Sequence, residues 1–79
     1  MNRDEVLANM IEFASRVYGV DASEINENTD VSAELGVKSI QRVALSASIE
    51  NEYDVMIPVA RISNYKTIGD LVDYVMEEA

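Results

Sequence analysis

The absence of both cysteine and histidine is the feature that most constrains how this chain of 79 residues folds. Without cysteine no disulfide can form, and without either residue the usual ligands of a structural zinc ion are missing. A chain of this size is near the lower limit at which one hydrophobic core gives a stable fold without such staples. We therefore expect a single domain over residues 1–79, held together by one apolar core.

The net charge of −9 limits the partners that this chain can have. Nucleic acids and anionic membranes attract basic surfaces, so we expect neither as a partner, and a basic protein fits better. No apolar run approaches the length that spans a membrane, and the first ten residues lack the features of a signal peptide. The expected compartment is the cytoplasm. The missing histidine also removes the commonest acid/base group, so any chemistry must be imported or built from carboxylates, hydroxyls and lysines.

Apolar residues recur at helical spacing from Val6 to Tyr18 and predict the first helix. Either Asn2 or Asp4 would cap its start, because both side chains can accept a hydrogen bond from a free backbone N–H. Gly19 stands where the left-handed residue that ends a helix is expected.

The segment over residues 21–36, which follows Gly19, mixes turn formers with acids and predicts a long loop. A loop of this length needs anchors in a compact domain, and Ile25, Val31 and Leu35 are the apolar residues available. A calcium-binding loop that starts at Asp21 would need glycine at its sixth position and glutamate at its twelfth. The chain has asparagine and serine at those positions, so we expect no specific metal site, and the acids form either a loose, nonspecific site for divalent cations or a solvated acidic face.

Three further helices complete the prediction. One runs from about Ser39 to Glu52, and a short turn over residues 59–62 follows Pro58, whose fixed φ suits the start of a helix. The last helix begins after Thr67, which forms a capping pattern with Asp70. A strand over residues 53–59 would have no second strand to pair with. The chain is therefore expected to be an all-α, four-helix bundle with three main helices, a short third helix and a long loop between the first two.

The helix over residues 39–52 has two apolar sides. At 100° per residue, Leu45, Ile49 and Tyr53 lie on one side, nearly opposite a second group. One interpretation is that the helix is buried between neighbours on both sides, and the other is that part of the stripe of Ile40, Val43 and Ala47 stays exposed as a docking strip; both can hold at once. The second group is Ile40, Val43, Ala44 and Ala47.

Ser39 stands at the predicted start of that helix, and two interpretations are open. As a plain cap it would accept a backbone N–H bond worth about 1 kcal/mol. A helix N-terminus also favours an anion, because its N–H groups are unpaired and its macrodipole is positive there, so Ser39 is also suited to carry a phosphate-linked group. Gly36 allows a tight backbone just before it, which would leave the hydroxyl accessible.

The segment "ELGVKSIQ", residues 34–41, resembles the prosthetic-group attachment motif of acyl carrier proteins. Leu35, Gly36, Ser39 and Ile40 match its Leu-Gly pair, its serine and the apolar residue after the serine. The segments "EYDVMIP" and "TIGDLVDYV" are similar to later stretches of the same family. The resemblance covers essentially the whole chain, and the length and acidity agree with it.

This resemblance implies a carrier that is not itself a catalyst. A phosphopantetheinyl transferase, using coenzyme A, would attach 4′-phosphopantetheine to Ser39, with Gly36 and Lys38 beside it. The thiol of this arm would hold acyl intermediates as thioesters for fatty-acid, polyketide or related biosynthesis. The other partners would be acyl-loading and acyl-processing enzymes, and the protein would be a monomer. The docking residues would be Ile40, Arg42, Val43, Ala47 and Glu50.

The sequence departs from the family in the charge around Ser39. Lys38 replaces the usual aspartate, and Arg42 follows one turn later. Where family members carry acids, Gln41, Ala44, Ser46 and Ser48 leave none before Glu50 and Glu52. We therefore expect general-purpose transferases and fatty-acid enzymes to recognise the chain poorly, and a dedicated pathway to use it. The alternative is a small helical adaptor that binds a protein through the same face and has no prosthetic group.

Overall fold

The computed structural model describes residues 2–31, 39–56 and 66–78, except for the side chains of residues 39, 40 and 42. These residues form helix α1 (Arg3–Tyr18), the short 3-10 helix η1 (Ala22–Glu24), helix α2 (Ser39–Tyr53) and helix α4 (Ile68–Glu78). The described part contains no strand beyond one isolated bridge, so the predicted all-helical class is confirmed. The predicted short helix over 59–62 and the anchor Leu35 lie outside the described residues.

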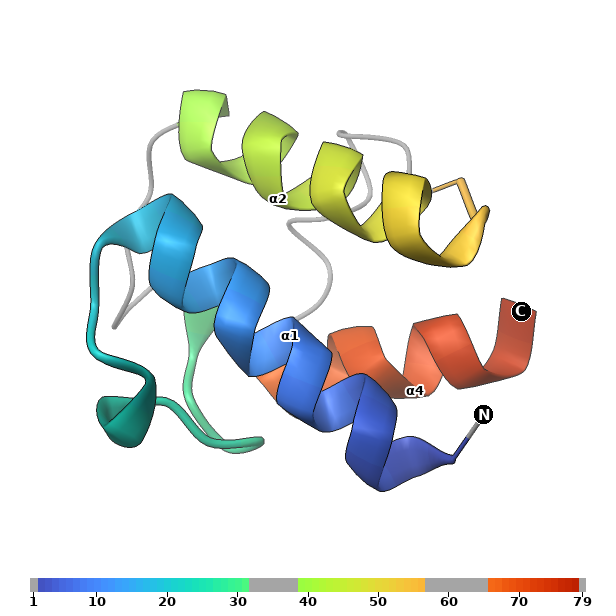
Figure 1. Ribbon diagram of the computed structural model, residues 1–79, viewed down its shortest axis with the longest axis horizontal. Helices are drawn as coiled ribbons and strands as arrows, with labels where there is room; N and C mark the ends of the chain where they lie inside the picture. The colour runs from blue at the N-terminus through green and yellow to red at the C-terminus, as the bar shows by residue number, and fades with distance from the viewer. Residues whose placement is uncertain (1, 32–38, 57–65, 79) are drawn as a thin grey trace.

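Helix α1 packs against both α2 and α4, which run in the opposite direction to it (Figure 1). The start of α2 lies at the same end of the molecule as the last turn of α1. Side chains from all three helices meet in one core, which has the apolar character that the sequence required. Its fully buried members are Val6, Met10, Ala14, Leu45, Ile49, Ile68, Leu71, Val72 and Val75.

The ends of α1 follow the sequence pattern. The Asn2 side chain accepts a hydrogen bond of 2.9 Å from the N–H of Glu5, so Asn2 is the cap of the two candidates. Gly19 has a φ of 68°, and its N–H donates to the carbonyl of Ser15 at 2.9 Å. Glycine adopts this left-handed conformation without the steric cost that other residues have.

The loop after α1 is anchored as predicted, since Ile25 and Val31 are both buried. Within it the structure contains one turn that was not predicted, the 3-10 helix η1. The carboxylate of Asp21 caps this turn by accepting the N–H of Ser23 at 2.9 Å. This hydrogen bond favours the charged carboxylate and lowers the pKa of Asp21.

Three backbone hydrogen bonds fasten the loop to the start of α4. The first-turn N–H groups of a helix have no partner within the helix, and here loop carbonyls accept two of them. The bonds run from Ile68 N–H to Thr29 O at 3.1 Å, from Gly69 N–H to Glu27 O at 2.8 Å, and from Val31 N–H to Lys66 O at 2.8 Å. They surround an isolated antiparallel bridge between Asp30 and Thr67.

Side chains strengthen the same junction. Thr67 Oγ1 accepts the N–H of Asp70 at 3.1 Å, and Asp70 Oδ2 accepts the N–H of Thr67 at 3.2 Å, which confirms the predicted capping pattern. Arg3 pairs with Glu27 at 2.8 Å and with Asp73 at 3.0 Å. The hydrogen bonds to Glu27 and then Asp73 raise the pKa of Arg3, so this side chain links α1, the loop and α4 as a cation.

Replacing Gly69 with alanine tests how closely the loop approaches α4. A Cβ at this buried position would stand 3.0 Å from the carbonyl oxygen of Glu27 and 3.4 Å from its Cβ. Alanine improves helix propensity by about 1 kcal/mol, but overpacking costs about 1–3 kcal/mol. We expect Gly69→Ala to lower the free energy of unfolding by roughly 1 kcal/mol in urea denaturation. A gain in stability would contradict the close approach.

Candidate functional site

The inner side of α2 forms part of the core. Leu45 and Ile49 are fully buried. Tyr53 is partly buried, and its hydroxyl accepts a hydrogen bond from Asn9 Nδ2 of α1 at 2.8 Å. These three residues form the first of the two apolar sides predicted for this helix. In the structure they face the core.

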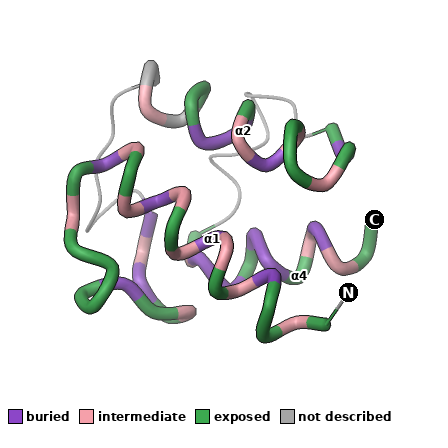
Figure 2. The backbone as a smooth tube through the Cα atoms, in the orientation of Figure 1, coloured by how far each residue is buried: buried purple, intermediate pink, exposed green. Residues whose placement is uncertain are grey.

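The opposite side of α2 faces solvent. The Val43 side chain is 46% exposed, and Ala44 and Ala47 are exposed as well. Figure 2 shows buried and exposed segments alternating along the helix. Part of the second apolar group is therefore exposed, and α2 is not buried at Val43, Ala44 and Ala47.

Ser46 lies on the inner side of α2. In the sequence it was grouped with Gln41, Ala44 and Ser48, which stand where acyl carrier proteins usually have acids. It is only 3% exposed, and its hydroxyl donates to Glu50 Oε1 at 3.4 Å. The physical reason is helical geometry, because Ser46 lies between the directions of Leu45 and Ile49 on one side and Glu50 on the other. A small hydroxyl is tolerated there because it has a hydrogen-bond partner.

Ser39 is the first residue of α2, and no acidic residue occurs in the first turn of that helix. The backbone therefore offers a phosphodiester the unpaired N–H groups and the positive end of a 15-residue helix, with no carboxylate in that turn to repel it. The start of α2 fits a phosphate-linked group in this respect.

The other predicted site residues divide into two groups. Gly36 and Lys38 lie outside the described residues, and the same holds for the side chains of Ser39, Ile40 and Arg42. Val43 and Ala47 share the exposed strip. Glu50 is partly buried, with the hydrogen bond from Ser46 described above.

The charge along α2 is uneven. Residues 39–49 contain no acid, whereas Glu50, Glu52 and Asp54 follow within five residues. No group of acids, among the residues whose placement is described, is arranged to hold a metal ion.

Met56, which follows α2, is 75% exposed, and this exposure was not predicted. The apolar segment "VMI" gives no indication that its methionine faces solvent.

A family model described as "Phosphopantetheine attachment site" matches residues 9–75 of this chain. The chain is also similar to an acyl carrier protein of Acidothermus cellulolyticus, at 29% identity over 95% of this chain and 89% of the relative. A meromycolate extension acyl carrier protein of Mycobacterium leprae is 27% identical over 98% of this chain and 67% of the relative. An acyl carrier protein of Myxococcus xanthus is 27% identical over 94% of both chains.

The fold and the start of α2 define a small helical domain suited to hold a phosphate-linked group. The chain belongs to the phosphopantetheine attachment family, and the resemblance to acyl carrier proteins seen in its sequence is confirmed. Its cofactor is covalently attached 4′-phosphopantetheine. Among the residues that the structure covers, none of the helices has the length and apolarity needed to cross a lipid bilayer.

Two truncations on α2 distinguish its two faces. Leu45→Ala leaves a cavity in the core and is expected to cost about 3 kcal/mol of unfolding free energy. Val43→Ala removes a half-exposed side chain and is expected to change stability by less than about 0.5 kcal/mol. Urea denaturation of both variants measures the difference. Equal losses would show that the outer face is packed as well.

Proposed function

We propose that this protein is an acyl carrier whose 4′-phosphopantetheine arm is attached to the hydroxyl of Ser39. The observation that carries the proposal is the position of Ser39 as the first residue of a helix without an acid in its first turn. The match to the attachment-site family over residues 9–75 includes this position.

The arm supplies a thiol, and a thiol is both a better nucleophile and a better leaving group than an alcohol, which suits it to hold an acyl group as a thioester. The chain has no cysteine of its own, so no internal thiol competes for the acyl group. The work of the protein's own residues is to present the arm and to bind enzymes. The adaptor without a prosthetic group is not favoured, because it leaves the family match unexplained.

The docking strip beside Ser39 consists of Val43 and Ala47, with Ile40 and Arg42 earlier in α2 and Glu50 after them. A phosphopantetheinyl transferase and acyl-processing enzymes are the proposed partners. Gly36 and Lys38 complete the proposed attachment site. The protein works in the cytoplasm as a monomer, and the net charge of −9 supports this state because it disfavours self-association.

The test of the attachment site is modification by a phosphopantetheinyl transferase with coenzyme A and Mg²⁺. Mass spectrometry is expected to show one added phosphopantetheine on the unaltered protein and none on Ser39→Ala. Ser48→Ala is the matched control, since Ser48 is a partly exposed serine of the same helix whose hydroxyl donates to the Ala44 carbonyl. Modification of Ser39→Ala would exclude Ser39 as the attachment point.

Lys38 sets the charge next to Ser39 and is expected to select the transferase. Lys38→Asp restores the acid that is usual in the family, and electrostatic steering changes association rates by roughly 10- to 1000-fold. With a general-purpose transferase we expect kcat/KM to rise about tenfold at low salt. The gain should shrink at high salt, because the interaction is screened. An unchanged kcat/KM would show that Lys38 does not decide partner choice.

A further inference from the structure

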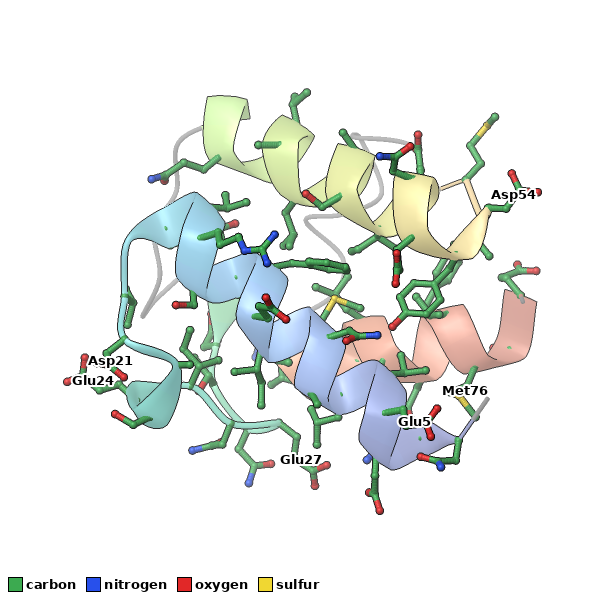
Figure 3. The ribbon with its side chains drawn as sticks, in the orientation of Figure 1. Glu5, Asp21, Glu24, Glu27, Asp54 and Met76 are labelled. Atoms are coloured by element: carbon green, nitrogen blue, oxygen red, sulfur yellow. The ribbon has the colours of Figure 1, made fainter. Side chains whose placement is uncertain are left out.

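A shallow hollow of about 250 Å³ lies on the surface between α1 and α2. Residues three or four apart share one face of a helix, so each of the two helices lines one wall of the hollow. The lining residues are Phe13 and Arg16 from α1, and Ser48, Asn51 and Glu52 from α2. The hollow therefore lies in the second half of α2, the end of which is marked in Figure 3 by Asp54.

The two walls of the hollow carry opposite charges that do not pair with each other. Arg16 forms an ion pair with Glu12, one turn earlier on α1, whereas Glu52 forms none within the described residues. A guanidinium has several N–H donors, so Arg16 retains donors for a further group. The Asn51 side chain has no hydrogen-bond partner among the residues that the structure describes. The hollow thus offers both donors and acceptors to a partner.

These features define the class of side chain that fits the hollow. An ionised side chain of either sign would be attracted by one wall and repelled by the other, so a neutral group is favoured. Phe13 is partly buried against the core and contributes an aromatic ring to the lining. Aromatic pairs gain energy beyond the area that they bury. A neutral aromatic side chain with a polar tip satisfies both conditions.

Tyrosine meets these conditions better than phenylalanine or tryptophan. Its hydroxyl is neutral at pH 7, with a pKa of about 10, and it both donates and accepts hydrogen bonds. It can donate to the carboxylate of Glu52 while it accepts from Arg16 or Asn51. The tryptophan N–H only donates, and phenylalanine does neither. The hollow is also smaller than the range of about 300–1,000 Å³ that is usual for small-molecule pockets, so one side chain of a larger partner is the expected occupant.

The hollow borders the exposed outer side of α2. Ala44, Ser48 and Asn51 follow one another at spacings of four and three residues, so they form one row from the exposed strip to the hollow. At 1.5 Å per residue, Ser48 lies about 14 Å and Asn51 about 18 Å along the helix axis from Ser39. An interface of ordinary size, about 800 Å² on each partner, extends over such a distance. A protein that contacts the strip can therefore also reach the hollow.

We propose that the hollow between α1 and α2 binds a tyrosine side chain of an enzyme that works on the loaded arm. The tyrosine ring lies against Phe13, and its hydroxyl bonds to Glu52 and to Arg16 or Asn51. The identity of the partner as such an enzyme rests on the proposed carrier function. The inference extends the contact surface of the protein from α2 to α1.

The test uses a five-residue peptide, blocked at both ends, with one tyrosine between glycine and serine residues. It is titrated into the full chain and followed by two-dimensional NMR. We expect saturable shift changes centred on Phe13, Ser48 and Asn51, including the side-chain amide of Asn51. The same peptide with phenylalanine or tryptophan in place of tyrosine should bind at least about threefold more weakly, because hydrogen bonds of the hydroxyl are lost.

A pair of variants tests the role of the carboxylate. Glu52→Ala removes the acceptor for the tyrosine hydroxyl and should weaken binding at least about threefold. Glu77→Ala is the matched control, since it removes an exposed acid of α4 that does not line the hollow, and it should leave binding unchanged. Because both acids are exposed, both variants should unfold at the same urea concentration as the unaltered protein.

The inference is overturned if the three peptides bind equally, if none binds saturably, if Glu52→Ala has no effect, or if the shifts centre on Val43 and Ala47. The titration is repeated on Ser39→Ala, which cannot carry the arm under the proposed function. Failure of the transferase test with tyrosine binding intact would overturn the carrier function alone. Loss of tyrosine binding with modification of Ser39 intact would overturn this inference alone.

Discussion

The three hydrogen bonds between the loop and the start of α4 are the constraint on which the arrangement of the helices depends. They satisfy backbone donors that α4 cannot satisfy itself, and they hold the long loop against the bundle, where Ile25 and Val31 reach the core. Gly69 permits this contact because it has no side chain to meet Glu27. Arg3 adds ion pairs to the loop and to α4. Since α1 and α4 are joined in this way, α2 completes the core through its inner side, which carries Leu45 and Ile49.

Helix α2 has a buried side and an exposed side, and only the buried side holds it in the core. Leu45 and Ile49 hold the helix, so the outer residues are free to differ in charge without loss of the fold. Residues 39–49 contain no acid and Glu50, Glu52 and Asp54 follow them, and this distribution of charge does not alter the buried side. The outer side of α2 is exposed at Val43, Ala44 and Ala47, next to the start of the helix where we propose that the arm is attached.

Much of the fold was predictable because local rules decided it. Helical spacing defined α1, α2 and α4, and Thr67 and Gly19 marked ends that the structure confirms. The 3-10 turn at Ala22–Glu24 was not predicted; it is a single turn, capped where the Asp21 carboxylate accepts the N–H of Ser23. The burial of Ser46 follows from its position between Ile49 and Glu50 around the helix, although its residue type indicates a surface position. The surroundings of Met56 include Tyr74, a residue distant in sequence, which spacing alone does not reveal. The predicted start of a helix at Ser39 is confirmed, and its role as the attachment point remains a prediction from the motif.

The most direct measurement of the central claim is peptide mapping of the protein purified from the cells that make it. Trypsin cleaves after Lys38 and after Arg42, and the resulting peptide of residues 39–42 contains one hydroxyl, that of Ser39. The account predicts that the phosphopantetheine mass is found on this tetrapeptide. Finding the arm on a peptide that carries another serine, such as Ser46 or Ser48, or finding no arm on any peptide, would contradict it.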